Sequence, residues 1–451
     1  MHRKTEITFE TIPPMEELTH YLINFLIGRT SHSDLVSTIG YTSDATLFSR
    51  YKIVIIPSPF FKDTIYGKAE SLPTLPLKKI DDTPILYGEP ILENIGDTLV
   101  VHADLLASAY FMLTRYEEWV RTDCRDIHGR FPGKESIAYR ANFIDRPIVD
   151  EYGKLLRKWL REKGVALDEP TPEIAKIYLT HDVDQPFLYR TWRGLAGAGL
   201  RSLKNKNSEF STAIKTFFGN LYSDKLFTFP WIFEQDKNFR QKTTIPTNII
   251  LFFKSAKTES KEDKPFYPLG STDIQHLFSL CEKENTIIGL HNSYLSGDKP
   301  LLILSEKELL EQYTNREIRY NRYHYLRSMN PTDMEYLVEA NITDDFTLGY
   351  ADVAGFRLGT CKVVNWINPA SKKISNLQLH PLTLMDVSLS DKKYMNLNQA
   401  DAFTYATKLI DKVKEHHGEL VLLWHNTSLA QEGMVNHKKL YSDLLQYIYN
   451  A

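Results

Sequence analysis

Three apolar stretches of the sequence run directly into side chains that can bind metals or move protons. These side chains are His181-Asp182-Val183-Asp184, His291 and His425. In an extended chain, residues two apart point to the same side, so Asp182 and Asp184 would share one side of a strand. Two such carboxylates can divide labour, because one can hold a metal ion while the other acts as a general base. The alternative is that both only form a turn or cap a helix, as Asp does at many strand ends.

The two later histidines suit other parts of the same chemistry. An imidazole near a carboxylate suits a divalent transition metal such as zinc, which makes His291 a candidate ligand. His425 could protonate a leaving amine as a general acid, and Asn426 beside it could donate a hydrogen bond. Alternatively, His291 makes an ordinary hydrogen bond in a loop, and His425 packs as a satisfied core histidine below Trp424.

Two arginine-containing segments could contact a polar substrate. Arg322, His324 and Arg327 lie within residues 321–327, and Arg357 lies between two glycines. The guanidinium fork of arginine could bind a sugar or orient a carboxylate. Equally, the arginine stems could pack on neighbouring tyrosines of a solvated strand.

The elements around these residues alternate as they do in an α/β protein. We expect strands at 177–180, 248–253, 286–291 and 419–425. We expect helices between them at 273–284, 305–318 and 331–340. Ser305 and Glu308 have the spacing of a capping box, and Pro331 would lie in the first turn of its helix. Such alternation predicts a mostly parallel sheet or barrel, with the chemistry at the carboxyl ends of its strands.

The chain length and a proline-containing segment that resembles a linker predict two domains. A chain of 451 residues is too long for one ordinary core. Residues 1–168 are expected to form a separate N-terminal α/β domain, with elements at 52–57, 104–121 and 150–163. Two prolines and two acids within 167–172 resemble a linker. The second domain would span 169–451, with a basic, helix-like insertion at about 185–242.

Composition bounds the partners of the chain. Apolar residues make up 42% and charged residues 25%, and the net charge of −3 supplies no positive field for nucleic acid. No segment approaches about 18 apolar residues in a row, so we expect no membrane span. The insertion contains Arg190, Arg193, Arg201, Lys204 and Lys206, and could touch an anionic membrane surface or a charged substrate. The alternative is a solvated helix face.

Cysteine usage and the first residues predict a cytoplasmic location. Cys124, Cys281 and Cys361 are odd in number and far apart, which argues against a disulfide framework and a thiolate zinc site. The first ten residues lack the apolar core of a secretory signal. In the cytoplasm, a cell-wall polymer would be out of reach as a substrate.

The strand-end motifs resemble those of the polysaccharide deacetylase family, also called the NodB-homology group. The resemblance covers roughly residue 176 to the C-terminus, and the stretch 113–118 resembles an N-terminal accessory domain of unknown function found in a bacterial branch. The resemblance implies a distorted (β/α) barrel. It also implies a divalent metal that helps to remove acetyl groups from N-acetylated sugars.

The resemblance assigns catalytic and metal-binding roles. Asp182 would be the base, Asp184 a metal ligand and His425 the general acid. The second family motif has two histidines four residues apart, and here His291 fits the first position while Leu295 occupies the second. The missing ligand could be His324, water or nothing. The arginine motif of the family is matched loosely, by Arg322 or by Arg357.

We therefore expect a metal-dependent hydrolase, a carbohydrate N-deacetylase acting on a glycan or glycan precursor. Its cofactor would be a divalent metal, with zinc favoured, and substrate contacts would come from Arg322, Arg327, Arg357 and Asn426. The rival interpretation is a catalytically inactive carbohydrate-binding or scaffold protein on the same fold, and Leu295 is its best support. A third possibility is hydrolysis of another amide, such as a small cyclic amide, by the same site.

Overall fold

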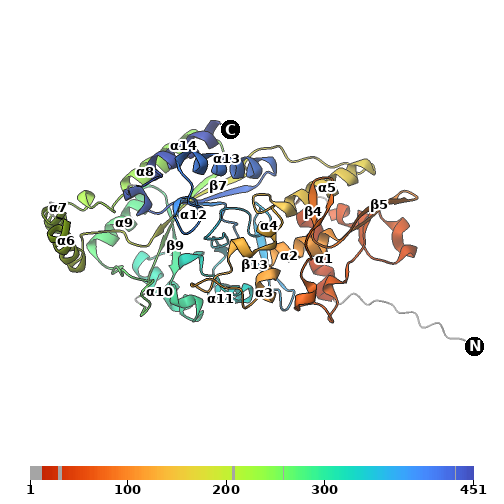
Figure 1. The fold of residues 1–451 in the computed structure, drawn as a ribbon, viewed down its shortest axis with the longest axis horizontal. Coiled ribbons are helices and arrows are strands. Elements are labelled where there is room, and N and C mark those ends of the chain that lie inside the picture. The colour runs from red at the N-terminus through yellow and green to blue at the C-terminus, as the bar shows by residue number, and fades with distance from the viewer. Residues whose placement is uncertain (1–12, 29–32, 206–208, 257, 432, 451) are drawn as a thin grey trace, which may run out of the picture. The chain divides into compact units, whose positions relative to one another are not determined.

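The protein divides into two compact units that exchange chain segments. A computed structural model describes all residues except 1–12, 29–32, 206–208, 257, 432 and 451 (Figure 1). Unit 1 comprises Met1–Thr122, Ile148–Glu169 and Asn365–Ser375. Unit 2 comprises Asp123–Pro147, Pro170–Val364 and Asn376–Ala451. The domain boundary expected after residue 168 stays a prediction. No feature of the sequence predicts the two exchanged segments, which are 123–147 in unit 2 and 365–375 in unit 1.

Unit 1 is built on a four-stranded sheet. The strand order is β1 (Ile39–Tyr41), β2 (Ile53–Ile55), β6 (Thr98–Ala103) and β5 (Gly88–Ile95). The first three strands are parallel and β5 is antiparallel to β6. The predicted strand at 52–57 is the central strand β2, whose three residues are fully buried. A small antiparallel hairpin adds β3 (Lys78–Ile80) and β4 (Thr83–Ile85).

The helices of unit 1 differ from the prediction at one point. They are α1 (Pro13–Ile27), α2 (Leu105–Leu113), α3 (Tyr116–Val120) and α5 (Ile148–Glu162). The single helix expected at 104–121 is wrong, because Arg115 adopts a left-handed φ of 56° and separates α2 from α3. Non-glycine residues rarely adopt this conformation, so propensity alone does not reveal such a break.

Unit 2 contains most of a nine-stranded sheet, in which only residues 365–367 and 374–375 belong to unit 1. From edge to edge the strands are β12 (Val364–Ile367), β13 (Ile374–Leu379), β11 (Asp344–Asp345), β10 (Tyr320–Tyr323), β9 (Ile287–Asn292), β8 (Thr247–Phe253), β7 (Lys176–Val183), β15 (Glu419–Leu423) and β14 (Leu384–Met385). All pairs from β13 to β14 are parallel. The α/β class, with a separate N-terminal α/β sheet, is therefore confirmed, and the barrel is an open one.

The sheet curls because its inner face closes around an apolar core. Residues at alternate positions of neighbouring strands, among them Tyr178, Phe252 and Val421, pack together in one buried cluster. At the amino ends of β11 and β15, His380 bonds to Asp344 and to Glu419, although these two strands are not neighbours in the sheet. Because helices cover the outer face, the central strands are buried on both sides and have nearly continuous apolar sequences.

The helices of unit 2 follow the predicted alternation. They include α8 (Phe229–Lys242), α9 (Thr272–Lys283), α10 (Leu302–Thr314), α11 (Glu335–Glu339), α12 (Asp386–Ser390), α13 (Gln399–Glu415) and α14 (His437–Asn450). The predicted capping box is wrong: α10 begins at Leu302, and Ser305 lies inside it with its hydroxyl bonded to the carbonyl of Leu302. Pro331 does begin a helical segment, the 3-10 turn η9 (Pro331–Met334) that precedes α11.

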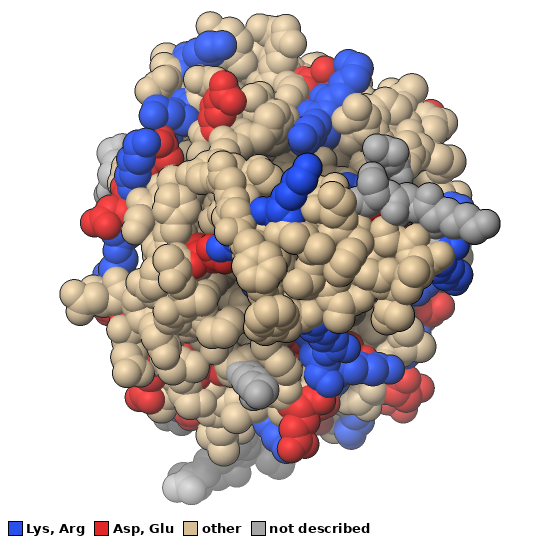
Figure 2. Space-filling model, turned by 90° about the vertical axis from the view of Figure 1, so that its left-hand side faces the viewer, with Lys and Arg blue, Asp and Glu red and all other residues tan. Residues whose placement is uncertain are grey.

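The predicted insertion contains two further helices before α8. They are α6 (Trp192–Asn205) and α7 (Glu209–Phe218), at the left-hand end of Figure 1, which is the end facing the viewer in Figure 2. In the part of the chain that the structure describes, no helix is long and apolar enough to cross a membrane.

Candidate metal centre

The end of β7 sends consecutive side chains to opposite faces of the sheet. Tyr178 faces the inner core, and Asp182, four residues later on the same strand, also faces inward. His181 points the other way, toward α8 and α14, where it bonds to Asp236. Asp184 follows directly after the strand and lines the same cleft as Asp182.

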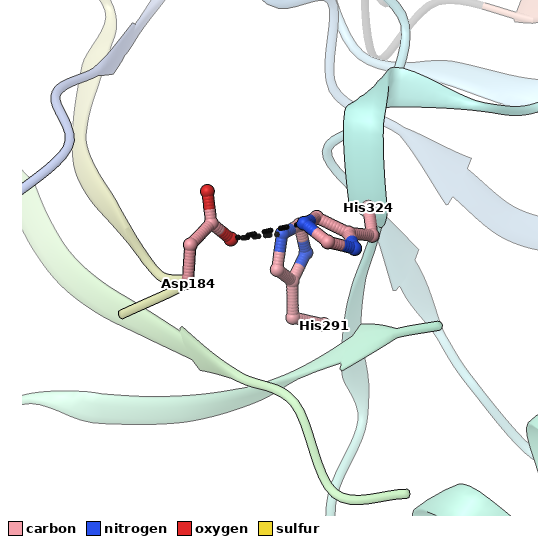
Figure 3. Close-up of side chains that lie close together, drawn as sticks. All are labelled: Asp184, His291 and His324. Atoms are coloured by element: carbon pink, nitrogen blue, oxygen red, sulfur yellow. Dashed lines mark ion pairs between the residues drawn. The ribbon is translucent and has the colours of Figure 1, made fainter. Parts of the chain in front are cut away.

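Asp184, His291 and His324 converge on one point (Figure 3). Oδ1 of Asp184 lies 3.1 Å from Nε2 of His291 and 3.4 Å from Nε2 of His324. One ligand atom from each residue falls within 4.8 Å of the other two. His291 is in β9 and His324 follows the neighbouring strand β10 in the 3-10 turn η8 (His324–Leu326), whereas Asp184 follows β7, which β8 separates from β9.

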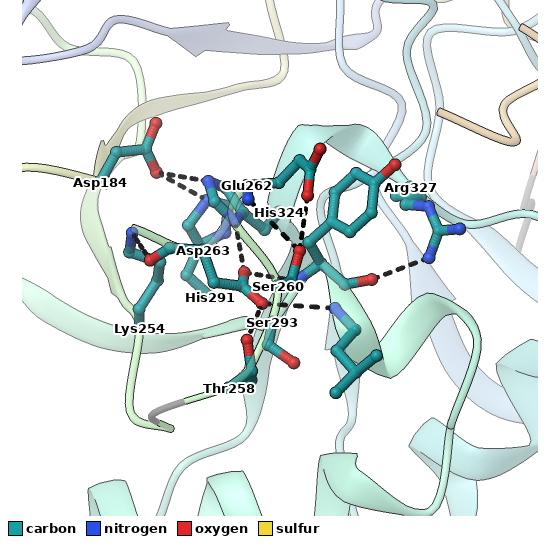
Figure 4. Close-up of polar contacts among 12 residues, drawn as sticks. Asp184, Lys254, Thr258, Ser260, Glu262, Asp263, His291, Ser293, His324 and Arg327 are labelled. Carbon is teal, nitrogen blue, oxygen red and sulfur yellow. Dashed lines mark hydrogen bonds and ion pairs between the residues drawn. The ribbon is translucent and has the colours of Figure 1, made fainter. Parts of the chain in front are cut away.

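Hydrogen bonds at the other ring nitrogens orient both histidines, and Figure 4 shows the one between His324 and Asp263. Nδ1 of His291 donates to the backbone carbonyl of Arg322 at 2.9 Å. Nδ1 of His324 donates to Oδ1 of Asp263 at 2.9 Å. Each bond leaves Nε2 as the free lone pair, which is how metal-binding histidines are usually held.

The charge state of the cluster also suits a cation. Burial raises the pKa of Asp184, but the nearby rings of His324, His291 and His425 outweigh burial and hold that pKa well below its usual value. Burial lowers the pKa of His324, so its ring is neutral at pH 7 and can act as a ligand. Burial raises the pKa of Asp263, but hydrogen bonds led by that from His324 lower it to about 2.

The donor set fits a divalent transition metal. Oδ1 of Asp184 is buried and has no hydrogen-bond partner among the described residues, although two imidazole nitrogens face it. An oxygen and two imidazole nitrogens match zinc and similar ions, with room for water or substrate in the remaining position. Asp184, His291 and His324 are therefore a candidate metal-binding triad.

The backbone that carries His324 is strained. Tyr325 and Leu326 both have left-handed φ angles, 62° and 53°, and neither is a glycine. Such conformations persist only where surrounding contacts impose them, and they concentrate at functional sites. The tight turn aims the ring of His324 back toward Asp184.

Arg322 positions Asp182 instead of facing the cleft. The arginine is fully buried, donates from Nη1 to Oδ1 of Asp182 at 2.9 Å, and donates from Nε to the carbonyl of Phe346 at 3.0 Å. Its guanidinium lies over the ring of Phe252. Of the two roles expected for this arginine, the geometry corresponds to orienting a carboxylate.

His425 is held by a second carboxylate. Its Nδ1 and its backbone amide donate to the two oxygens of Asp386, each at 2.8 Å. Its Nε2 lies 3.9 Å from Asp182 and 3.8 Å from Asp184. Burial lowers the pKa of His425, but Asp386, followed by Asp184 and Asp182, raises it to about 10. The ring is therefore protonated at neutral pH.

These groups lie at the base of a cleft of about 970 Å³. One wall comes from residues 126–130, which belong to the exchanged segment of unit 2. The carbonyl of His128 accepts a hydrogen bond from Arg327, and Arg130 bonds to the carbonyl of Tyr325. The buried ammonium of Lys254 also lines the cleft.

Three residues predicted to bind substrate lie away from the cleft lining. Arg327 donates hydrogen bonds to Asp298 and to the backbone carbonyls of Tyr294 and His128. Arg357 is buried and donates to the carbonyl of Gly349. Asn426 donates from Nδ2 to the carbonyls of Gln185 and Leu226. Each makes a structural contact, so the prediction that these side chains face substrate finds no support in the geometry.

Asp263 and Asp386 were missed by sequence reasoning. Asp386 follows the two-residue strand β14, so the strand-end pattern that singled out Asp184 applies to it, but the strand is too short to recognise. Asp263 lies in a polar loop, and only its contact with His324 reveals it. The wall at 126–130 carries no sequence signal for a site.

Comparisons with known proteins cover parts of the chain. Residues 15–165 match a family model described as a family of unknown function, DUF7033, and this match includes the cleft wall at 126–130. No curated protein matches the chain. Among solved structures, the chain is similar to a "putative polysaccharide deacetylase" from Mycobacterium smegmatis. Sequence identity is 13%, the match covers 63% of this chain and 86% of that chain, and the TM-score is 0.39.

Proposed function

We propose that the chain is a metal-dependent hydrolase that removes N-acetyl groups from an amino sugar in a glycan or glycan precursor. One observation carries the proposal: a single cleft brings together an oriented carboxylate, a candidate metal triad and a protonated histidine. Amide hydrolysis needs these three groups, for water activation, for stabilising charge on the carbonyl, and for protonating the amine. The sugar specificity rests on the family resemblance of the motifs.

Asp182 would act as the general base. Its Oδ1 is held by Arg322, which leaves Oδ2 for the proton of the attacking water. As the water oxygen bonds to the amide carbon, the water proton passes to Asp182. A divalent metal held by Asp184, His291 and His324 would supply Lewis acidity at the carbonyl when bound.

His425 would act as the general acid. With Nδ1–H donated to Asp386, the proton on Nε2 is directed toward the cleft. Breaking of the carbon–nitrogen bond leaves acetate and the sugar amine, and the amine takes the Nε2 proton. The pKa of about 10 keeps this proton in place at neutral pH until the amine departs.

Acetate release tests the proposal. Purified protein, loaded with zinc and with other divalent metals, would be incubated with N-acetylated glucosamine oligomers and with a nucleotide-linked N-acetylamino sugar. We expect acetate from at least one substrate. Asp182→Asn should keep its metal and lose this activity, whereas Asp184→Asn should lose both. Asp443→Asn, a change at a partly exposed position on α14 outside the cleft lining, serves as the matched control.

The inactive-scaffold interpretation predicts a different result. In that case the wild-type protein would bind the sugars, in calorimetry for example, without releasing acetate under any metal. Undiminished acetate release by Asp182→Asn would instead contradict the role of this carboxylate. Acetate release from the sugars would also argue against a cyclic amide as the substrate.

A further inference from the structure

Large apolar side chains are concentrated on the surface of α6 and α7. Twenty large apolar side chains are exposed among the described residues, and seven of them lie between residues 192 and 222. Leu203 is 81% exposed, Phe218 73% and Trp192 72%. Exposed apolar patches of this kind mark interaction surfaces on soluble domains. Uncharged side chains cover most of the view in Figure 2, and Lys and Arg side chains lie among them.

The exposed residues form stripes along both helices. Phe210, Ile214 and Phe218 are spaced by four residues and so lie on one face of α7. On α6, the exposed Trp192, Leu200 and Leu203 fall within about 80° of the helix circumference. A buried cluster, Tyr189, Leu195, Ala198 and Ala213, joins the two helices, and the rings of Trp192 and Phe218 also meet between them while both stay largely exposed.

The same segment is strongly basic. Residues 185–225 contain seven Lys or Arg and two acids, a net charge of +5, whereas the whole chain carries −3. Both acids are engaged, since Glu209 pairs with Arg201 and Asp224 accepts backbone amides. Within the described residues, Arg193, Lys204 and Lys215 are exposed and make no ion pair. On α6, Arg193 and Lys204 lie immediately beside the apolar stripe.

An ion pair and hydrogen bonds attach helices α6 and α7 to the rest of unit 2. Arg190 forms a two-pronged ion pair with Asp273 of α9 and also donates to the carbonyl of Thr216 in α7. At its root, the side chain of Asn426 holds the carbonyls of Gln185 and Leu226. Gln185 follows Asp184, and Asn426 follows His425. The segment that contains the helical pair therefore begins directly beside a residue of the candidate metal centre.

We propose that α6 and α7 bind the surface of an anionic lipid bilayer. Helices with exposed Trp, Phe and Leu beside Lys and Arg lie in the headgroup layer, where the apolar side chains enter the acyl boundary and the cations meet lipid phosphates. Positive charge beside the apolar stripes favours this occupant over an uncharged apolar partner. The proposal does not depend on the proposed hydrolysis. If that hydrolysis holds, attachment brings the cleft to glycans carried on lipids.

Vesicle sedimentation tests the proposal. The full chain would be mixed with vesicles of phosphatidylcholine alone and with vesicles of equal parts phosphatidylcholine and phosphatidylglycerol. We expect binding to the anionic vesicles, weakened by salt, and little binding to the neutral ones. The double variant Leu203→Gln with Lys204→Glu should bind roughly tenfold more weakly. The matched control is Leu301→Gln with Lys299→Glu, a similarly exposed pair outside the insertion, which should bind as the wild type does.

Three results would overturn the proposal. One is equal binding to both kinds of vesicle, and another is an equal loss of binding in the control pair. The third is a wild-type dimer in sedimentation velocity that becomes monomeric in the Leu203→Gln, Lys204→Glu variant, because the patch would then cover a second copy of the chain. Unchanged thermal unfolding and metal content would show that the variants remain folded.

Discussion

Four buried histidines of unit 2 are of two kinds, which differ in what the second ring nitrogen contacts. In His291 and His324, Nδ1 bonds to the protein and Nε2 faces the unpartnered oxygen of Asp184. In His181 and His380, both ring nitrogens are bonded to protein oxygens. All four are buried beside carboxylates. Among these four histidines, the candidate ligands are distinguished by a free Nε2 that faces Oδ1 of Asp184, not by burial or a nearby acid.

The structural histidines tie elements together. His181 bonds to the carbonyl of Trp424 and to Asp236 of α8, which also accepts from Tyr441 of α14. This network joins β7 to the segment after β15 and to two outer helices. Its carboxylate is fully buried, so losing a partner there leaves a charge with less compensation.

The largest expected effects come from removing one histidine of each kind. His291→Ala should abolish metal binding and cost less stability than His181→Ala, because it removes the hydrogen bond to the Arg322 carbonyl but leaves no buried carboxylate without its partner. His181→Ala should lower the free energy of unfolding by about 3–5 kcal/mol, because Asp236 stays buried without its partner. Elemental analysis and urea unfolding measure the two effects. Metal retained in His291→Ala would contradict the distinction, as would unimpaired stability in His181→Ala.

Asp386→Asn probes His425, which belongs to neither kind of histidine. Its Nδ1 bonds to Asp386, and its Nε2 faces the carboxylates of Asp182 and Asp184. If the proposed hydrolysis holds, kcat should fall roughly hundredfold or more, because the ring loses its orienting partner. The amide also removes the main cause of the raised pKa of His425, so the alkaline limb of activity should move to lower pH. Acetate release across pH measures both. Metal content should not change, and a loss of metal would assign Asp386 to the metal site instead.

Asp263→Asn tests whether the partner of His324 supports a ligand. Outer partners of metal-binding histidines typically contribute about 10–100-fold to metal affinity, and a fall of that size is expected here. Competition with a chromogenic chelator measures it. Asp298→Asn, which changes a partner of Arg327 in the same region, is the control. Equal affinities in wild type and Asp263→Asn would mean that His324 is not a ligand.

The sequence predicts the fold best where strands are buried on both faces. β7, β8, β9 and β15 have continuous apolar segments, and each was expected within a few residues. β10 was not expected, because its sequence Tyr-Asn-Arg-Tyr is polar. Its Asn321 and Arg322 are buried only because Asp345 and Asp182 bind them. Such pairing depends on the finished fold.

The sequence likewise predicts some residues of the candidate site and not others. Strand-end position reveals Asp184 and His291 directly, and His324 only as one possible replacement for Leu295. The partners Asp263 and Asp386 lie 61 and 39 residues from the histidines they orient. Contacts over such separations follow from packing, which a single sequence does not display. Sequence reasoning therefore finds candidate ligands more readily than the groups that distinguish them from structural histidines.

Tyr441→Phe should have a moderate effect that is confined to the structural network. It removes one hydrogen bond to Asp236 and leaves that buried oxygen with one partner fewer, which costs about 1–3 kcal/mol of unfolding free energy. Metal affinity should not change, because His181 keeps its bonds to Asp236 and to Trp424. Urea unfolding and metal titration check the two parts. Weakened metal binding would mean that the network also positions the ligands.

The smallest expected effect is the pH dependence of the His380 contact. Burial lowers the pKa of His380, but Asp344 and then Glu419 raise it above its ordinary value of 6.5. Stabilisation by the charged ring is therefore complete below 6.5 and is lost as pH rises through the raised pKa. For Asp344, burial raises the pKa but His380 and other partners lower it below 3.8, so its contribution is lost only as pH falls through that lower value.

The two shifts together define a window from about pH 4 to about pH 6.5 in which the contact stabilises the fold most. His380→Gln, which keeps hydrogen-bonding capacity but cannot become charged, should therefore lower the melting temperature more at about pH 5 than at about pH 9. His276→Gln, at a half-buried histidine that bonds to the Tyr222 hydroxyl and to no carboxylate among the described residues, is the control and should show no such difference. An equal loss at both pH values would mean that His380 holds β11 and β15 together by neutral hydrogen bonds. The charge of the ring would then be irrelevant to closing the curled sheet.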